Sequence, residues 1–368
     1  MKRIMRFFLA LVMFMSYLPL NPITSYANDD VANGNVNDGV KIDDVFSDEN
    51  FKKYVSDNFD KNKNGYLSDD EVADVTELSI GKQGISSLNG IGFFKNLTKL
   101  DCSENEIESL DLSNNTKLFF LDCSINKLNR LDVSNNRDLT TLYCHTNQLT
   151  NLDVSENTNL TKLICNGNNL TNLFVGYNID LTELNCNNNK LKNLYVGRNE
   201  NLTNLWCAYN ELESLYLGYN KNLTKLGCDN NKLESLDVSE IPNLTSLYCS
   251  GNKLTSLDLS KNKNLTKLEC SNQQYNISIN KDTREFKYSK FPGKFNKDKV
   301  TSPAGASFGN DALTVDSNNP SEVTYNYKVA EGKEMNVKLN VTYKDVVKTS
   351  TDPKVQVTEG YTRVTFDA

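Results

Sequence analysis

The stretch DKNKNGYLSDDE, residues 60–71, carries oxygen-bearing side chains at the spacing of a twelve-residue calcium-binding loop. Gly65 allows the sharp turn that wraps such a loop around a hard cation. The predicted ligands are Asp60, Asn62, Asn64, the Tyr66 carbonyl, Ser68 and Glu71. Because only two of them bring charge, we expect weak, structural Ca²⁺ binding, in the range of about 10⁻⁴–10⁻³ M. The alternative is a metal-free turn between two short helices, and the lack of a second, paired loop argues against a sensor role.

The rest of the sequence offers no constellation of residues for catalysis. The single histidine, His145, is expected at the surface. Motifs for zinc hydrolysis, a serine nucleophile, a Cys-x-x-Cys redox pair or a phosphate-binding loop are absent from the sequence. The many acids and serines fall at repeat turns, where they serve as caps and Asx turns. We therefore predict no catalytic residues and a non-enzymatic protein.

Nine cysteines recur every 21 residues from Cys102 to Cys270, and asparagines follow three residues later from Asn105 to Asn252. Two registered series without an insertion predict a mainly β solenoid of leucine-rich repeats over residues 75–273. Coils about 4.8 Å apart would hold the cysteine side chains parallel, which disfavours disulfides. We therefore expect buried free thiols, with each asparagine amide bonded to the backbone of its bend.

Because the period is fixed, outward side chains of successive repeats form rows. The position before each cysteine is acidic at the ends of the array and largely apolar or aromatic in its middle. On the other flank most repeats read L-D-V-S or L-D-L-S, but three adjacent repeats replace Asp by an aromatic residue and Ser by Gly. The predicted ligand-binding residues are Tyr143, Ile164, Trp206, Tyr209 and Tyr248, together with Phe174, Tyr177, Tyr195, Arg198, Tyr216 and Tyr219. Exposed aromatics with an arginine are typical of interaction sites, although a tyrosine ladder can also serve only to stabilise a sheet.

The segments on either side of the repeats predict two further units. Residues 28–45 are expected to be a disordered linker. Residues 46–74 are expected to form a small α-helical, EF-hand-like cap, with a helix over 46–59 and cap chemistry from Ser47 and Asn50. Ile80 and Gln83 at one end, and Gln273 at the other, depart from the cysteine and asparagine rows, as terminal units should.

From Tyr275 the period stops and short alternating runs begin, at residues 275–279, 285–288, 312–315, 322–329 and 335–343. This pattern predicts an Ig-like β-sandwich over residues 274–345, which lacks cysteine and hence an internal disulfide. Residues 346–368 are interpreted as a linker and the start of a truncated β module.

Residues 1–27 have the basic start, apolar run and small-residue end of a secretory signal peptide, with an uncleaved anchor as the alternative. We therefore expect a secreted or cell-surface protein without membrane insertion after signal removal. The net charge of −7 argues against nucleic acid and against an anionic membrane surface as partners.

The repeat N-L-T-x-L-x-C-x-x-N-x-L-x-x-L-x-V-S-x-N, seen at residues 243–262 with Leu259 for Val, resembles the internalin J-like cysteine-ladder proteins of Gram-positive bacteria. The resemblance extends over roughly residues 46–345 and includes the helical cap and the Ig-like segment. Such proteins are typically attached to the cell wall and act as adhesins, which implies the same role here. The sequence shows no L-P-x-T-G sorting signal, so wall anchoring is not evident in this chain.

Together these observations predict a monomeric, extracellular binding protein that acts as a bacterial surface adhesin. The outward faces of its solenoid would bind a protein or a glycan of a host or neighbouring cell. The alternatives are a structural spacer that displays a missing C-terminal domain, or the non-catalytic part of a larger secreted enzyme.

Overall fold

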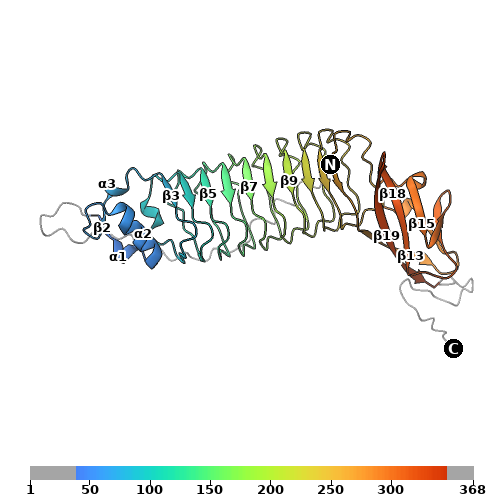
Figure 1. The fold of residues 1–368 in the computed structure, drawn as a ribbon, viewed down its shortest axis with the longest axis horizontal. Helices are drawn as coiled ribbons and strands as arrows, with labels where there is room; N and C mark the ends of the chain where they lie inside the picture. Colours follow the sequence, from blue (N-terminus) through green and yellow to red (C-terminus); the bar gives the residue numbers. More distant parts are fainter. Residues whose placement is uncertain (1–38, 346–368) are drawn as a thin grey trace, which may run out of the picture. The chain divides into compact units, whose positions relative to one another are not determined.

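The computed structural model describes residues 39–345, and the predicted signal peptide, most of the predicted linker and the tail at 346–368 lie outside this range. Within it the strands form a two-stranded, a ten-stranded, a four-stranded and a three-stranded sheet (Figure 1). The ten-stranded sheet belongs to the predicted solenoid.

Each coil of the solenoid contributes one three-residue strand to this parallel sheet. The strands are β3 (Glu77–Ser79), β4 (Lys99–Asp101), β5 (Phe120–Asp122), β6 (Thr141–Tyr143), β7 (Lys162–Ile164), β8 (Glu183–Asn185), β9 (Asn204–Trp206), β10 (Lys225–Gly227), β11 (Ser246–Tyr248) and β12 (Lys267–Glu269). Neighbouring strands pair without a register shift, so that Leu205 lies beside Leu226 and Leu226 beside Leu247. On the opposite flank, isolated parallel bridges join Asp153, Phe174, Tyr195 and Tyr216. The predicted leucine-rich-repeat solenoid with a 21-residue coil is confirmed.

The cysteine row lies inside the solenoid. All nine thiols are buried and free, as the parallel arrangement of their side chains predicted. Removal from water raises the pKa of Cys165 and of Cys207 to about 12, because a thiolate is poorly solvated in the core. The sulfur atoms therefore act as neutral packing atoms rather than as nucleophiles.

The predicted asparagine row is buried beside the cysteines and is fully bonded. Asn126 donates from Nδ2 to the carbonyls of Cys102, Cys123 and Ser124, and its Oδ1 accepts from the Ile107 amide at 2.9 Å. Gln273 makes the same set of bonds at the end of the array. Each amide thus joins two successive coils and satisfies backbone groups that would otherwise be buried without partners.

A second row of buried asparagines was not predicted. It consists of Asn115, Asn136, Asn157, Asn178, Asn199, Asn220 and Asn262, with Ile241 in the place of one asparagine. Each Nδ2 donates to two carbonyls of the preceding coil; for Asn178 these belong to Val154 and Asn157. Its Oδ1 atoms have no hydrogen-bond partner among the described residues. The 21-residue spacing of these asparagines was the available signal.

The N-terminal unit contains β1 (Val40–Lys41), α1 (Ile42–Val45), α2 (Glu49–Phe59), β2 (Tyr66–Leu67) and α3 (Asp69–Val72). The expected disorder is wrong for residues 39–45, because Val40 pairs with Leu67 and Ile42 is buried. The predicted helix starts at Glu49 rather than at residue 46. The predicted cap by Ser47 and Asn50 is also wrong, because Asp48 accepts from the Phe51 amide at 2.9 Å.

Asp48 also connects the helical unit to the solenoid. Its second carboxylate oxygen accepts from the amide and the hydroxyl of Ser86, each at 2.7 Å. Partial burial opposes ionisation, but the bonds from Phe51 and Ser86 outweigh it and lower the pKa of Asp48. A short 3₁₀ turn, η1 (Ile91–Phe93), follows, and Phe94 packs against Phe59 at 5.2 Å between ring centroids.

After β12 the chain forms two smaller sheets. The first orders β13 (Gln273–Asn280), β19 (Lys333–Lys344), β18 (Glu322–Ala330) and β15 (Val300–Ala304), and the second orders β14 (Glu285–Lys287), β17 (Ala312–Val315) and β16 (Ala306–Phe308). Short turns η2 (Tyr288–Lys290) and η3 (Lys297–Lys299) lie between them in sequence. β15 and β16 escaped prediction because Pro303 and a register shift interrupt the alternation. Tyr325 donates its hydroxyl to the Thr255 carbonyl at 2.9 Å, which joins this unit to the last coils.

Candidate binding faces and a candidate calcium loop

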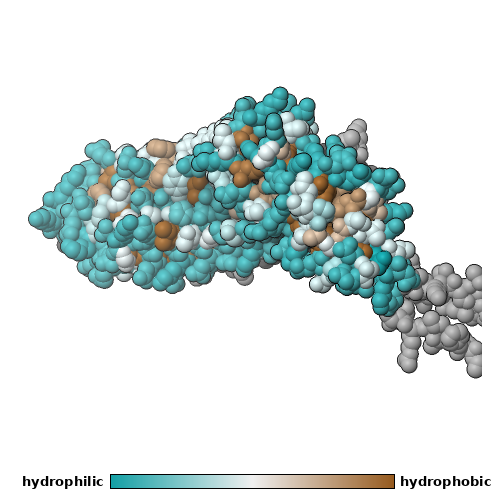
Figure 2. Space-filling view, turned by 45° about the vertical axis from the view of Figure 1, so that its right-hand side comes forward, coloured by the Kyte–Doolittle hydropathy of each residue, from teal (hydrophilic) through white to brown (hydrophobic). Residues whose placement is uncertain are grey.

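The predicted residues on the flank opposite the cysteine strand form one continuous group, which we call the aromatic flank. It consists of Phe174, Tyr177, Tyr195, Arg198, Tyr216 and Tyr219. Parallel bridges place Phe174, Tyr195 and Tyr216 side by side on three successive coils. The five aromatic side chains are between 53% and 64% exposed. Five of the ten exposed large hydrophobic residues in the described part of the chain therefore lie on three adjacent coils. The face seen in Figure 2 is mostly hydrophilic with small separate apolar spots.

The paired change from Asp–Ser to aromatic–Gly has a steric cause. In coils with Asp and Ser, the Asp carboxylate closes the turn by accepting from the Ser amide, at 3.0 Å between Asp132 and Ser134. In two of the three aromatic coils the ring lies over the glycine instead, whereas a Cβ on Gly197 would meet only the Tyr219 ring of the next coil, at 3.7 Å. A Cβ on Gly176 would lie 2.6 Å from Cζ of Phe174, and a Cβ on Gly218 would lie 2.8 Å from the Tyr216 hydroxyl. Glycine is therefore what allows the ring to lie across its own turn.

Two aromatic pairs flank a central arginine in this group. Phe174 and Tyr177 meet edge to face at 5.5 Å and 77°, and Tyr216 and Tyr219 do so at 6.0 Å and 68°. Arg198 occupies the row position between Tyr177 and Tyr219 and makes no ion pair with any other described residue. The flank thus presents two aromatic pairs, and the exposed Tyr195 ring and the Arg198 cation lie on the coil between them.

The predicted residues on the strands of the ten-stranded sheet form a second surface, which we call the strand face. This surface is less continuous than the sequence pattern suggested. Tyr143, Ile164, Trp206 and Tyr248 are half-buried on adjacent or nearby strands. Trp206 and Tyr248 come together at 5.9 Å, with the Trp206 ring over Gly227, where a Cβ would lie 2.5 Å from Cε3.

Tyr143 lies in another group on this face. Its ring packs against Phe120 at 5.6 Å, and the Lys162 ammonium lies 5.4 Å from its centre. Ile164 joins neither aromatic contact. The structure therefore splits this face into two groups, one around Tyr143 and one around Trp206, and the sequence interpretation missed Phe120 and the role of Gly227.

Tyr209 stands apart from both groups on a strained turn. Its φ is +55° and its side chain is 56% exposed. The equivalent residue is asparagine in the two adjacent coils and glycine in the next ones, but Ile125 also adopts a φ of +53° and is exposed. The ladder imposes this conformation, since the Tyr209 amide donates to the Asp229 carbonyl at 2.8 Å. Left-handed backbone is unfavourable for such bulky side chains, by about 1–2 kcal/mol.

The predicted calcium loop folds around its two carboxylates. Asp60 accepts from the amides of Asn64 and Gly65 at 3.1 and 3.0 Å. Glu71 accepts from the Lys61 and Ser68 amides, both at 2.9 Å. Burial opposes ionisation of Glu71, but the bonds from Ser68 and Lys61 outweigh it and lower its pKa. Both carboxylates are buried, so two anionic groups are held within one short loop.

The other predicted ligands of this loop offer oxygen atoms, which are the donors that a hard cation prefers. Asn62, Asn64 and Ser68 contribute neutral oxygens, and Tyr66 contributes its carbonyl. No three or more His, Cys, Asp or Glu side chains in residues 39–345 are arranged so that they could hold a metal ion by themselves, so any cation here depends on these neutral oxygens. β1 supplies the antiparallel partner of β2, at Val40 opposite Leu67, which the sequence interpretation did not anticipate. Ca²⁺ is the cation that accepts such a mixed all-oxygen set.

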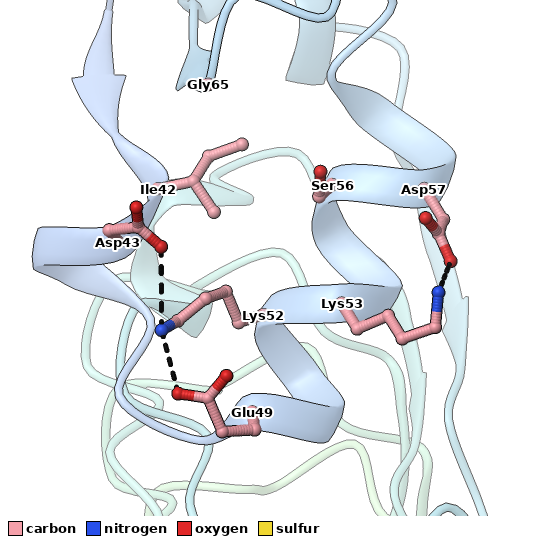
Figure 3. Close-up of a pocket in the computed structure, with 8 residues that line it drawn as sticks. All are labelled: Ile42, Asp43, Glu49, Lys52, Lys53, Ser56, Asp57 and Gly65. Carbon is pink, nitrogen blue, oxygen red and sulfur yellow. Dashed lines mark hydrogen bonds and ion pairs between the residues drawn. The ribbon is translucent and has the colours of Figure 1, made fainter.

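A cavity of about 300 Å³ lies between α1, α2 and the Gly65 turn (Figure 3). Ion pairs occupy its charged groups: Lys52 lies 3.0 Å from Glu49 and 3.5 Å from Asp43, and Lys53 lies 2.7 Å from Asp57. None of its lining residues is His or Cys. Elsewhere His145 Nδ1 lies 3.2 Å from the Thr146 hydroxyl.

No helix in residues 39–345 combines the length and the apolar character that crossing a membrane requires.

Comparison with known proteins bears on the repeats. No family model matches the chain. Internalin J of Listeria monocytogenes serotype 4b (strain F2365) is 41% identical over 75 residues, which are 20% of this chain and only 8% of internalin J. The solved functional domain of InlJ from Listeria monocytogenes, which includes a cysteine ladder, aligns with 83% of this chain and 98% of its own, at 24% identity and a TM-score of 0.48. A TDR receptor structure aligns with 57% of this chain and 41% of its own, at 23% identity and a TM-score of 0.52.

The similarity in sequence confirms the predicted resemblance to internalin J-like leucine-rich-repeat proteins, and the likeness to the TDR receptor shows a shared fold over the aligned part.

Proposed function

We propose that this chain is a non-enzymatic binding protein of the cell exterior, a surface adhesin whose binding surface is the aromatic flank. The observation that carries the proposal is the coordinated replacement of Asp and Ser by an aromatic residue and Gly in three adjacent coils. Each replacement removes a hydrogen bond that closes the turn and exposes a large ring to water. The edge-to-face pairs offset part of the lost stability but leave all five rings more than half exposed, so a partner that covers the rings explains why both changes occur together.

The strand face supports the proposal less strongly. Its aromatic side chains are half-buried and pack on one another or on Lys162, which accounts for them as stabilising pairs along the sheet. We therefore assign the primary contact to the aromatic flank and a secondary contact to Trp206 and Tyr248.

The test is adhesion of the whole chain to host and bacterial cells. Tyr195→Ser combined with Tyr216→Ser is expected to reduce adhesion by about tenfold or more, as for loss of central aromatic anchors. Phe119→Ser is the matched control, because Phe119 is also exposed, at 45%, but lies outside the aromatic flank. Unchanged adhesion in the double variant would favour the alternative role as a spacer.

We also propose that the loop of residues 60–71 binds Ca²⁺ weakly and stiffens the junction between α2 and the first coils, and that the two sheets after β12 form an Ig-like β-sandwich. Titration calorimetry on the whole chain tests the metal site. Heat is expected at millimolar Ca²⁺ and is expected to disappear in Glu71→Ala but to remain in Asp43→Ala. Asp43 is a suitable control because it lies near the loop but is paired with Lys52. Equal heat in the wild type, Glu71→Ala and Asp43→Ala would contradict the proposal of a metal site.

A further inference from the structure

The two aromatic pairs of the aromatic flank are separated by a fixed distance along the solenoid. Parallel bridges link Phe174 to Tyr195 and Tyr195 to Tyr216, so the pairs lie two coils apart. Parallel neighbours are about 4.8 Å apart, which places the Phe174–Tyr177 pair about 9.6 Å from the Tyr216–Tyr219 pair.

This separation matches the repeat of one chain conformation. A polyproline II helix has three residues per turn and a rise of about 3.1 Å, so its turn is about 9.3 Å long. A polyproline II segment that runs along the solenoid would therefore place every third residue against an aromatic pair. An α-helix has a pitch of about 5.4 Å and an extended strand a repeat of about 6.8 Å. Neither repeat matches the separation of about 9.6 Å between the two aromatic pairs.

The chemistry of the aromatic flank fits the same ligand. Each aromatic pair offers exposed rings on which the apolar face of a proline can pack, and the exposed tyrosine hydroxyls, that of Tyr195 included, can donate to the free carbonyls of a polyproline II backbone. Arg198 lies on the coil between the two pairs without an ion pair, although Glu200 follows two residues later. The cation favours an acidic ligand residue between the two prolines.

We propose that the aromatic flank binds a proline-rich segment in the polyproline II conformation, with prolines three residues apart on the two aromatic pairs and an acidic residue facing Arg198. This inference rests on the proposed function, since it names the partner of the same surface. The proposed ligand is a single class of peptide, with prolines three residues apart and an acidic residue between them.

The test measures fluorescence anisotropy of labelled twelve-residue oligoproline peptides with the whole chain. The first peptide carries Asp at its sixth position, the second carries Lys there, and the third has the Asp but replaces every proline by glycine. The Asp oligoproline is expected to bind at least about tenfold more tightly than the other two. Arg198→Glu is expected to reverse the preference, so that the Lys peptide binds best.

Two variants locate the binding on the flank. Tyr216→Ser removes one aromatic pair and is expected to weaken the Asp oligoproline by about tenfold, whereas Phe119→Ser leaves binding unchanged. Circular dichroism and thermal unfolding confirm that each variant is folded. Equal binding of the proline and glycine peptides, or binding that ignores Tyr216→Ser, would overturn the inference.

Other occupants give different results in the same experiment. Chitohexaose that binds with dependence on Tyr216, in place of oligoproline, would make the ligand a glycan. Self-association of the whole chain that Tyr216→Ser abolishes, measured by light scattering, would make the partner a second copy. Either result overturns the polyproline inference, and the proposed function stands or falls separately by the adhesion of the Tyr195→Ser, Tyr216→Ser double variant.

Discussion

Five coils of the solenoid carry Asp and Ser on the flank opposite the cysteine strand, and three carry an aromatic residue and Gly. The first kind closes its turn with its own side chain, as the Ser155 amide does with the Asp153 carboxylate at 2.9 Å. The second kind lacks that bond, and its ring can lie over the glycine, as the Phe174 ring lies over Gly176. Since the buried leucine and cysteine rows are the same in both, the difference is confined to three positions per coil, at Phe174, Gly176 and Tyr177 in the first aromatic coil. The buried rows therefore determine the conformation of the coil, whereas the residues of the flank can change, and can serve binding, without altering it.

The buried asparagine row should therefore matter equally in both kinds of coil, and here we expect the largest effect. Asn126 lies in an Asp–Ser coil and Asn189 in an aromatic coil, and each donates to three carbonyls and accepts one amide. Replacing either by Ala leaves buried backbone groups unpaired and should lower the free energy of unfolding by about 3 kcal/mol. Urea unfolding monitored by circular dichroism measures both. A difference of more than about 1 kcal/mol between them would contradict a common core.

The second asparagine row supplies the control. Asn199→Ile should cost clearly less than Asn189→Ala, because Ile241 already occupies one position of this row and Asn199 Oδ1 has no partner among the described residues. The carbonyls of Val175 and Asn178 lose a donor but keep their backbone bonds from Asn178 and Leu181.

Conversion of one coil type into the other should have the next largest effect. Phe174→Asp with Gly176→Ser restores the turn-closing bond and removes the conformational freedom of Gly in the unfolded chain. Together these should raise the free energy of unfolding by about 1 kcal/mol. Adhesion should fall in the same protein, because one aromatic pair is lost. A converted coil that is less stable than the wild type would show that the rings stabilise the fold, and the binding interpretation of the comparison would fail.

Features that recur with the 21-residue period could be predicted from the sequence. Features that depend on contacts between particular residues could not. The solenoid, the buried thiols and the first asparagine row followed from residue type and spacing alone. The start of α2 at Glu49 and the order in residues 39–45 could not be predicted, because they depend on Asp48 meeting Ser86 and on Val40 pairing with Leu67, far along the chain. The division of the strand face likewise depends on Trp206 bending over Gly227, which is a contact between neighbouring coils.

The strained turn at Tyr209 offers a smaller effect, at a position that does not distinguish the two kinds of coil. Tyr209→Asn relieves a left-handed backbone, and Asn already occupies this conformation at Asn188 and Asn230 in the coils on either side. The free energy of unfolding should rise by up to about 1 kcal/mol. Binding through the aromatic flank should be unchanged. A fall in stability would show that the Tyr209 ring makes packing contacts that outweigh the strain.

The smallest effect is a difference in acid sensitivity between the two kinds of coil. Hydrogen bonds from the Ser134 hydroxyl and amide lower the pKa of Asp132 in the folded state. A carboxyl with a lowered folded pKa stabilises the fold fully above its unfolded pKa, about 3.9, and loses that contribution as the pH falls through the folded value. Asp132→Asn should therefore lower the thermal midpoint at pH 7 but not at a pH well below 3.9.

Tyr195 gives the matched comparison, because its coil has no carboxylate at this position. Tyr195→Asn should shift the thermal midpoint by the same amount at both pH values, because this substitution neither adds nor removes a carboxyl group. A shift in Asp132→Asn that does not change between neutral and acid pH would mean that the turn is closed by the geometry of the oxygen acceptor alone. The charge on the Asp–Ser flank would then have no part in its stability, and the two kinds of coil would differ only in what they present to a partner.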